Sequence, residues 1–254
     1  MTIAEFFRDN PCVALAFSGG VDSAYLLYAG LRNKANIQPY FVKTAFQPAF
    51  ELKDALRLTE QLGVKLTIIE VDILSVEQVV ANPVDRCYYC KRALFEALKR
   101  QATSDGYDLI IDGTNASDDA DDRPGMRALQ ELGVRSPLRE CGISKSSIRK
   151  YSKVAELFTW DKPSYACLAT RIHTDEPIVG VVLNLIGSSE IALATMGFTN
   201  FRMRISQGLV TIQIPKEQKQ KALELEEHII RNTESLFAYG QVDLRGICFD
   251  FESR

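Results

Sequence analysis

The chain has 254 residues, of which 46% are hydrophobic and 25% are charged, as is usual for a globular protein with a substantial core. Its formal net charge of −3 provides no overall basic field, which argues against nucleic acid as a partner. We also expect a cytoplasmic protein without a membrane partner, because the sequence has no apolar run of about 20 residues and no secretory signal at its N-terminus.

Strand-like and helical segments alternate along the first two thirds of the chain. An apolar run ends at a glycine pair, and a helical pattern with Ala24, Leu27 and Leu31 on one face follows it. Repetition of this unit is typical of the α/β class, with a parallel, doubly wound sheet that carries helices on both faces. We therefore expect strands at 12–17, 37–45, 65–73 and 108–114, and helices at 21–35, 50–63 and 91–106.

The loop after the first strand reads SGGVDS (18–23). Two adjacent glycines let backbone N–H groups approach an anion closely, and the start of the following helix adds a favourable dipole. The serine hydroxyls are further donors, and Asp22 is suited to hold Mg²⁺ against phosphate oxygens. Neither the lysine of a G-x-x-x-x-G-K-[ST] loop nor a G-x-G-x-x-G pattern is present. The expected ATP-binding residues here are Ala16, Phe17, Ser18, Gly19, Gly20, Asp22 and Ser23.

The S-G-G-x-D-S pattern is similar to the PP-loop of the N-type ATP pyrophosphatases. That resemblance implies an adenine nucleotide alpha hydrolase-like fold and cleavage of ATP between its α- and β-phosphates, with transfer of AMP to a substrate oxygen. Thr44, at the end of the second expected strand, would then approach the adenosine. After the fourth strand, Gly113 permits close backbone approach, and Asn115 and Asp118 offer polar groups. The alternative for the acidic residues at 119, 121 and 122 is a solvated loop.

Three of the six cysteines form a pattern that suits a metal centre. Cys87 and Cys90 have the C-x-x-C spacing at which two thiolates converge on one metal or cluster, and Cys167 follows later in the chain. Without a secretory signal, disulfides are not expected. Three ligands fit an iron–sulfur cluster with one open iron. Zinc with His173 as a fourth ligand, a redox dithiol and a purely structural role remain alternatives. The other cysteines are Cys12 and Cys248, expected in the core, and Cys141, which has no assignment.

The character of the sequence changes after Arg171. A helical segment that ends at Gly197 is followed by two alternating strands, a charged helix and a final strand. Such a small α+β segment buries little surface by itself, which favours a symmetric homo-oligomer. We therefore expect an ATP-binding domain at 1–171 and an α+β domain for substrate binding and oligomerisation at 172–254, with strands at 201–206, 209–215 and 242–251.

Five segments of the chain, taken in order, resemble the LarE family of sulfur-inserting enzymes: SGGVDS, CYYCKRALF, DGTNASDDADDRPG, ELGVRSPL and KPSYACLATRI. The resemblance extends over essentially the whole chain, including FRMRIS and IQIP near its end. It implies adenylylation of a pyridinium biscarboxylate mononucleotide with ATP and Mg²⁺, followed by replacement of AMP with sulfur, on the route to the nickel-pincer nucleotide.

The same resemblance bears on the three cysteines. One branch of the family sacrifices a single cysteine, which becomes dehydroalanine, and another holds a [4Fe-4S] cluster with three cysteines. All three stand in this sequence, as Cys87, Cys90 and Cys167. The resemblance therefore implies the cluster branch, with these three as the catalytic cysteines and with sulfide or another sulfur donor as a partner.

Basic residues complete the expected substrate site. Lys91 directly follows Cys90 and is placed to neutralise a phosphate, while Arg202 and Arg204 alternate on a strand and so face one side. A solvated strand face is the alternative for these two arginines. The basic helix 145–153, capped by Ser144, is expected to be solvated surface rather than an RNA contact. The expected substrate-binding residues are Lys91, Arg123, Arg127, Arg202, Arg204 and Glu190, with Arg135 and Arg171 in supporting positions.

Other functions remain open from the sequence alone. A PP-loop enzyme that thiolates tRNA would use similar cysteines, although the acidic total and the lack of an added RNA-binding domain argue against it. An ammonia-dependent amidating ligase would have no use for three cysteines. A non-catalytic iron–sulfur carrier would not need a pyrophosphate loop. We therefore expect a small nucleotide as the substrate and no nucleic acid partner.

Overall fold

In the computed structural model, residues 1–118 and 124–252 are described, and they form two compact units. None of the helices in these residues is long and apolar enough to cross a membrane. The first unit contains Met1–Thr44, Ala49–Ile73 and Asp85–Ser164, and the second contains Ala45–Pro48, Leu74–Val84 and Tyr165–Arg254.

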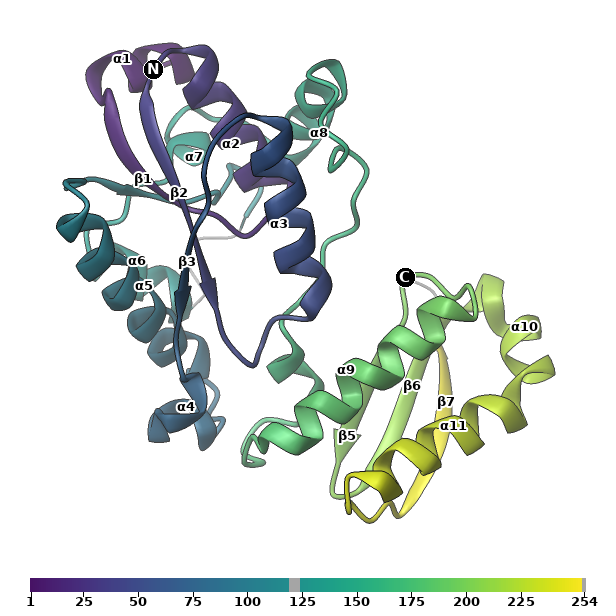
Figure 1. The fold of residues 1–254 in the computed structure, drawn as a ribbon. Coiled ribbons are helices and arrows are strands. Elements are labelled where there is room, and N and C mark those ends of the chain that lie inside the picture. The colour runs from purple at the N-terminus through teal and green to yellow at the C-terminus, as the bar shows by residue number, and fades with distance from the viewer. Residues whose placement is uncertain (119–123, 253–254) are drawn as a thin grey trace. The chain divides into compact units, whose positions relative to one another are not determined.

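The first unit is built on a parallel sheet of four strands in the order β3-β2-β1-β4. Helices cover both faces of this sheet, with α2 and α3 on one side and α5 and α6 on the other (Figure 1). The α/β class and the parallel sheet predicted from the alternating segments are therefore confirmed. The strands are β1 (Cys12–Ala16), β2 (Asn36–Lys43), β3 (Thr67–Glu70) and β4 (Ile110–Ile111), and the helices are α1 (Ile3–Asp9), α2 (Val21–Arg32), α3 (Ala49–Gln61), α5 (Arg86–Ser104), α6 (Pro124–Glu131), α7 (Pro137–Glu140) and α8 (Lys145–Val154).

Strand β1 explains why its sequence is an unbroken apolar run. Val13 and Leu15 pack into a large cluster with residues of α1, α2 and α3. Ala14, which lies between them, packs instead with Tyr40 and Leu98 on the opposite face of the sheet. Because successive strand residues point to opposite faces, a strand covered on both sides needs apolar residues at every position.

The second unit has a three-stranded sheet in the order β5-β6-β7, with β5 antiparallel and β7 parallel to β6. The β5–β6 hairpin turns at Gln207 and Gly208, which both have positive φ values, +46° and +77°, as a tight primed turn requires. The strands are β5 (Arg202–Ser206), β6 (Leu209–Pro215) and β7 (Gly246–Glu252), and the α-helices are α4 (Glu77–Val80), α9 (Gly180–Thr195), α10 (Lys219–Glu224) and α11 (Glu226–Tyr239).

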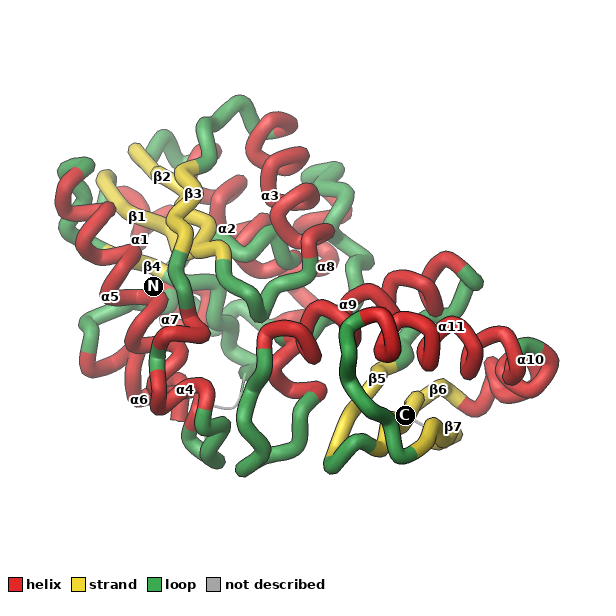
Figure 2. The backbone as a smooth tube through the Cα atoms, turned by 60° about the horizontal axis from the view of Figure 1, so that its bottom comes forward, coloured by secondary structure: helices red, strands yellow, loops and turns green. Residues whose placement is uncertain are grey.

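One face of this second sheet is covered and the other is polar. Met203, Ile205 and Ile212 are buried, and α9 and α11 run alongside the strands (Figure 2). The opposite face of the β5–β6 hairpin carries Arg204 and Thr211, which are direct cross-strand partners. The strand alternation predicted from the sequence therefore produces one apolar and one polar face.

Two cysteines do not lie where the sequence suggested. Cys12 and Cys248 were expected in the core, but both are exposed. Cys12 is the first residue of β1, before the buried part of the strand begins at Val13. Cys248 lies beside Thr211, with 3.4 Å between its Sγ and the Thr211 Oγ1. An apolar run therefore does not imply burial at the first residue of a strand, as at Cys12, or on the uncovered face of a sheet, as at Cys248.

Candidate functional site

The glycine loop has the geometry of an anion-binding turn. Gly19 has a φ of +70°, and a Cβ atom there would lie 3.1 Å from the backbone nitrogen of Ala55 in α3. Gly20 is the N-cap residue of α2, and no side-chain hydrogen bond caps the helix at that position. Ser18 Oγ accepts a hydrogen bond from the Gly20 N–H over 3.3 Å and lies 3.2 Å from Ser23 Oγ. The first N–H groups of α2 therefore stand at a loop that favours a bound anion.

Asp22, expected to hold Mg²⁺, lies in the first turn of α2 within a charged cluster. Its Oδ2 accepts a hydrogen bond from Lys145 Nζ, and its Oδ1 lies 3.4 Å from the amide nitrogen of Asn115. The same amide nitrogen donates to Asp118 over 2.9 Å. Burial raises the pKa of Asp22, and the adjacent Lys145 ammonium opposes that rise. Two carboxylates thus meet at the loop, and carboxylate oxygens are ligands that suit Mg²⁺.

The segment after β4 packs directly against this loop. A Cβ atom on Gly113 would lie 3.0 Å from the Ser23 backbone nitrogen, so only glycine fits without displacement. Asp112 is buried, and it accepts hydrogen bonds from the hydroxyl groups of Thr114 and Ser136. The residues expected to bind ATP after β1 and after β4 are therefore brought together at one edge of the sheet.

The beginning of the loop is tied to β2 through the backbone. Ala16 pairs with Tyr40 in the parallel register, and the Phe17 N–H donates to the Tyr40 carbonyl over 2.9 Å. Thr44 directly follows β2 at the same edge of the sheet. Ala16 and Phe17 therefore lead into the loop beside β2, and Thr44 lies at the end of that neighbouring strand, as predicted.

Lys145 belongs to this site and was not identified from the sequence. Helix α8 was expected to be a solvated surface helix capped by Ser144. The cap is confirmed, since Ser144 Oγ accepts from the Ser147 N–H over 3.3 Å. That cap starts the helix at Lys145, whose ammonium then reaches Asp22 across 123 residues of sequence. No spacing rule connects residues so far apart, so the sequence offered no signal for this ion pair.

Cys87 and Cys90 lie inside a helix rather than before it. The helix was expected to begin at Lys91, but α5 begins at Arg86. Three residues apart on a helix, the two cysteines occupy the same face in the first turns. Cys87 is exposed and Cys90 is half-buried, and the guanidinium of Arg86 lies 4.0 Å from Cys87 Sγ. This placement suits two thiolate ligands of one centre.

Two of the basic residues expected near these cysteines lie along the contact between α5 and α6. The aliphatic stem of Lys91 packs over Gly125, where a Cβ atom would lie 3.0 Å from Lys91 Cδ. The Arg127 guanidinium stacks 4.1 Å above the Tyr88 ring and lies 3.8 Å from Glu131. The side chain of Arg127 is thus held by its own neighbours. Arg123 and the acidic residues at 119, 121 and 122 lie outside the described residues.

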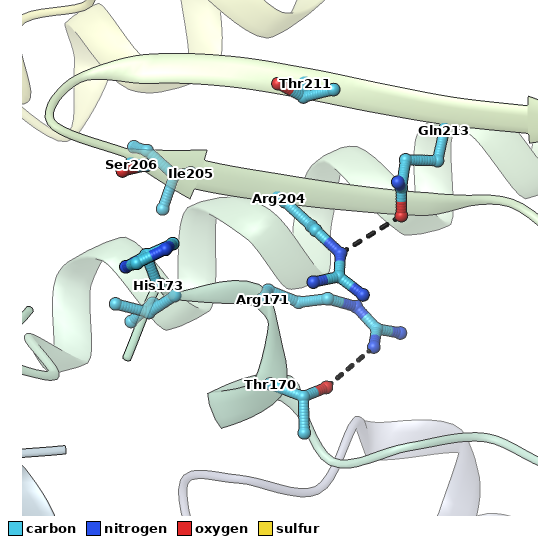
Figure 3. Close-up of a pocket in the computed structure, with 9 residues that line it drawn as sticks. Thr170, Arg171, His173, Arg204, Ile205, Ser206, Thr211 and Gln213 are labelled. Carbon is cyan, nitrogen blue, oxygen red and sulfur yellow. Dashed lines mark hydrogen bonds between the residues drawn. The ribbon is translucent and has the colours of Figure 1, made fainter. Parts of the chain in front are cut away.

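The second unit contains a pocket of about 270 Å³ on the polar face of its sheet (Figure 3). Arg204 enters it from β5, with its Nε donating to Gln213 Oε1 over 3.0 Å. Arg171 enters from the short helix Leu168–Arg171, with its Nη1 donating to Thr170 Oγ1 over 3.0 Å. Two guanidinium groups therefore lie at one pocket, and the exposed one, on Arg204, favours an anionic ligand. The pocket is lined by Thr170, Arg171, Ile172, His173, Arg204, Ile205, Ser206, Thr211 and Gln213.

Glu190 fixes the orientation of Arg171. The two side chains are 5% and 2% exposed, and Arg171 Nε lies 2.7 Å from Glu190 Oε1. The same carboxylate accepts hydrogen bonds from the Met203 backbone N–H over 3.0 Å and from the Tyr165 hydroxyl. Glu190, expected from the sequence to bind substrate, thus holds a pocket arginine in place. Arg202 is half-buried on the same strand face as Arg204.

Cys167 lies one helical turn before two of the residues that line this pocket. It directly precedes the helix Leu168–Arg171, and its carbonyl accepts from the Thr170 N–H over 3.0 Å and the Thr170 hydroxyl over 2.8 Å. Within residues 1–118 and 124–252, no three His, Cys, Asp or Glu side chains are grouped as metal ligands. Cys87 and Cys90 belong to the first unit and Cys167 to the second, so a three-cysteine cluster stays a prediction.

No protein-family profile matches the chain. An uncharacterized protein of Synechocystis sp. is 35% identical over 96% of this chain and 92% of its own. An uncharacterized protein of Methanocaldococcus jannaschii is 30% identical over 98% of this chain and 93% of its own. The pyridinium-3,5-bisthiocarboxylic acid mononucleotide synthase of Lactiplantibacillus plantarum is 27% identical over 96% of this chain and 90% of its own.

A shorter similarity connects the chain to a second kind of protein. The tRNA-specific 2-thiouridylase MnmA of Thermotoga maritima is 27% identical over 47% of this chain and 40% of its own. The similarity to full-length relatives, the geometry of the glycine loop and the parallel sheet all point to the same family. The chain belongs to the LarE family of PP-loop sulfurtransferases.

Proposed function

We propose that this protein uses ATP to insert sulfur into a pyridinium biscarboxylate mononucleotide, with AMP transfer to a carboxylate and release of pyrophosphate. The observation that carries the proposal is the position of Cys167, one helical turn from the pocket lined by Arg171 and Arg204. A sulfur-bearing residue thus adjoins a site built for an anion. The full-length similarity to a synthase of that substrate class supports the same assignment.

The glycine loop would bind the phosphates of ATP. The first N–H groups of α2 and the Lys145 ammonium provide positive charge for the pyrophosphate group that leaves. A carboxylate is a poor electrophile because its negative charge repels nucleophiles. Transfer of AMP converts it into an acyl phosphate with a good leaving group. The carboxylates of Asp22 and Asp118 suit a Mg²⁺ ion, which when bound would neutralise phosphate charge.

The pocket of the second unit would hold the anionic groups of the substrate. Arg204 and Arg171 offer guanidinium donors, and Thr211 adds a hydroxyl group. Because Arg171 is buried and held by Glu190, its donors are oriented before the ligand binds. A substrate with a phosphate and two carboxylates carries enough negative charge to use both arginines.

Cys87, Cys90 and Cys167 would hold a [4Fe-4S] cluster. Three thiolates leave one iron without a protein ligand, and when bound the cluster would carry sulfide there, so no cysteine is consumed. The positions of Cys87 and Cys90 one turn apart fit two of the three ligands. Cys167 would supply the third from the second unit.

The direct test uses anaerobically purified protein with ATP, Mg²⁺ and the biscarboxylate nucleotide. We expect brown protein, release of pyrophosphate, and a thiocarboxylate product detected by mass spectrometry. Cys167→Ala should abolish product formation while pyrophosphate release continues, and Cys12→Ala, which alters an exposed cysteine at the start of β1, should leave both unchanged.

Three outcomes would contradict parts of this proposal. Release of orthophosphate would contradict the PP-loop mechanism. Colourless protein with one zinc per chain would contradict the cluster. Loss of H₂S from Cys167 after turnover would show that the cysteine is sacrificed.

Thiolation of tRNA is the second candidate, favoured by the partial similarity to a tRNA-specific 2-thiouridylase. The net charge of −3 argues against it, because RNA binding depends on basic surface. Incubation with unmodified tRNA, ATP and sulfide, followed by nucleoside analysis, separates the two. Formation of thiouridine would favour the second candidate.

A further inference from the structure

The segment 156–162, just before the chain enters the second unit, is held by two helices of the first unit. From α3, Gln61 Nε2 donates to the Glu156 carbonyl over 3.1 Å, and the Arg57 guanidinium lies 4.2 Å above the Phe158 ring. From α8, the Lys153 ammonium lies 4.5 Å from the centre of the Trp160 ring. Side chains of both helices therefore hold this stretch, which forms turns and not a helix or strand of its own.

Arg149 makes the closest contacts between α8 and this segment. Its Nη1 donates to the Trp160 carbonyl and its Nη2 to the Lys162 carbonyl, both over 2.8 Å. A guanidinium presents such donors in a rigid fork, which fixes the two carbonyls relative to each other. Lys162 is also held from the other side, because its Nζ lies 2.6 Å from Asp54 Oδ2 in α3.

Both helices that hold the segment also contact the nucleotide loop. In α8, Lys145 is four residues before Arg149, on the same helix face, and pairs with Asp22. In α3, Ala55 follows Asp54 and lies against Gly19.

We propose that Arg149 is a positioning residue that couples nucleotide binding at the loop to the backbone of residues 156–162, and through it to the placement of Cys167. Phosphate at the loop competes with Asp22 for Lys145, and Mg²⁺ competes with Lys145 for Asp22. In either case the Lys145–Asp22 pair is weakened and the first turn of α8 can shift. The hydrogen bonds from the Arg149 guanidinium then shift the Trp160 and Lys162 carbonyls with the helix. The chain then reaches Cys167 five residues after Lys162.

The biological role of this coupling rests on the proposed function, because it would make sulfur transfer depend on prior activation of the carboxylate by ATP. Its mechanism needs only nucleotide binding. A ligand shifts a conformation only if it interacts differently with two states, and the Lys145–Asp22 pair provides such a difference. The coupling can therefore be measured without the sulfur acceptor.

The test is hydrogen exchange of the full chain with and without an α,β-methylene analogue of ATP and Mg²⁺. The amides of Leu157, Trp160 and Lys162 are hydrogen-bonded, so their exchange reports on this segment. In the wild type we expect the analogue to slow exchange over 156–162 by at least about fivefold. Arg149→Ala should remove this difference while the analogue still binds, and Arg149→Lys should retain part of it. Lys150→Ala, an exposed neighbour on α8, should behave as the wild type.

A purely structural role for Arg149 predicts a different result. Arg149→Ala would then raise exchange in both states and leave the effect of the analogue intact, which would overturn the proposal. So would the absence of any nucleotide effect in the wild type. If Arg149→Ala does not fold, Arg149→Gln provides the same comparison.

Turnover provides a second readout and separates this proposal from the proposed function. With the biscarboxylate nucleotide, Arg149→Ala should reduce the rate of thiocarboxylate formation about tenfold or more and change pyrophosphate release less than about twofold. Equal losses in both steps would contradict a positioning role. A wild type that makes no thiocarboxylate but shows the exchange effect would contradict the proposed function alone.

Discussion

Charged side chains beside the nucleotide loop are held in half-buried ion pairs. Lys145 and Asp22 are 30% and 23% exposed, and Lys162 and Asp54 are 18% and 28% exposed. Pairs at this depth contribute little net stability, because desolvation offsets most of their attraction. Their main effect is to fix the positions of the charged groups, and fixed positive charges are needed at a site that binds phosphate groups.

Glu51 in α3 leads to a prediction on the pH dependence of stability. Burial raises its pKa to about 7 from an ordinary value of 4.5; the Lys162 ammonium opposes this rise and the Asp54 carboxylate adds to it. Between these two pH values the folded protein holds the proton more tightly than the unfolded chain does. The free energy of unfolding therefore falls as the pH rises through this window and stays lower above it.

Glu51→Gln removes the titrating group and should therefore remove the decrease in the free energy of unfolding with rising pH. After allowance for partial exposure, we expect the variant to exceed the wild type in free energy of unfolding by of the order of 1 kcal/mol at about pH 8 and to match it at low pH. Urea denaturation at the two pH values measures this. Glu60→Gln, an exposed change on the same helix, is the control. Parallel pH profiles for wild type and Glu51→Gln would contradict the prediction.

The contact between the nucleotide loop and α3 restricts which residue can stand at position 19. Gly19 approaches the backbone of Ala55 so closely that a side chain meets it at 3.1–3.2 Å. Gly63, just after α3, has a similar φ of +68° but open space around it. The two glycines therefore share a conformational requirement and differ in their surroundings.

This pair of glycines permits a controlled comparison. Gly63→Ala should cost about 1 kcal/mol, the usual penalty for a left-handed residue with a Cβ atom. Gly19→Ala should cost more, because α3 must also move, and should weaken binding of the α,β-methylene analogue of ATP. Urea denaturation and titration calorimetry measure the two effects. Equal stability losses, with unchanged nucleotide affinity in Gly19→Ala, would show that the close approach is unimportant.

The chain is divided into two compact units, and each contains one of the two candidate ligand sites. Each unit has buried apolar residues of its own, around Leu15 and Leu26 in the first and around Met203 and Ile212 in the second. The glycine loop belongs to the first unit and the arginine pocket to the second. ATP should therefore stabilise one unit, whereas an anion in the pocket should stabilise the other.

Calorimetry of the full chain tests this division. We expect two unfolding transitions. Only one of them should move to higher temperature when the α,β-methylene analogue and Mg²⁺ are added, and at a hundredfold excess over Kd the free energy of unfolding of that unit should increase by about 2.7 kcal/mol. Inorganic phosphate should raise the other transition, and Arg204→Ala should reduce that rise. A single transition that responds to both ligands would contradict independent unfolding.

Local patterns were sufficient to predict the class of the fold and much of the nucleotide loop. The apolar run at β1, the adjacent glycines and the helical spacing of α2 each depend on residues close together in sequence. Backbone preference and side-chain period act over such short distances, so these features can be derived without the fold. The start of α5 was predicted five residues too late, at Lys91, although Asp85 is of a residue type favoured at the N-cap.

The pairs that complete the two candidate sites depend on the tertiary structure. Lys145 reaches Asp22 across 123 residues, and Asn82 and His173, which share a hydrogen bond within the second unit, are 91 residues apart. Glu190 could be identified as the residue that orients Arg171 only once the helix and the strand were packed together.

The sequence by itself determined the α/β class, the phosphate-binding loop and the set of cysteines, because each follows from neighbouring residues. The tertiary structure decided which charges meet at the loop, which arginines share a pocket, and which earlier segments of the chain join the second unit. Those arrangements depend on how the helices pack on each sheet, a property that no short stretch of the chain contains.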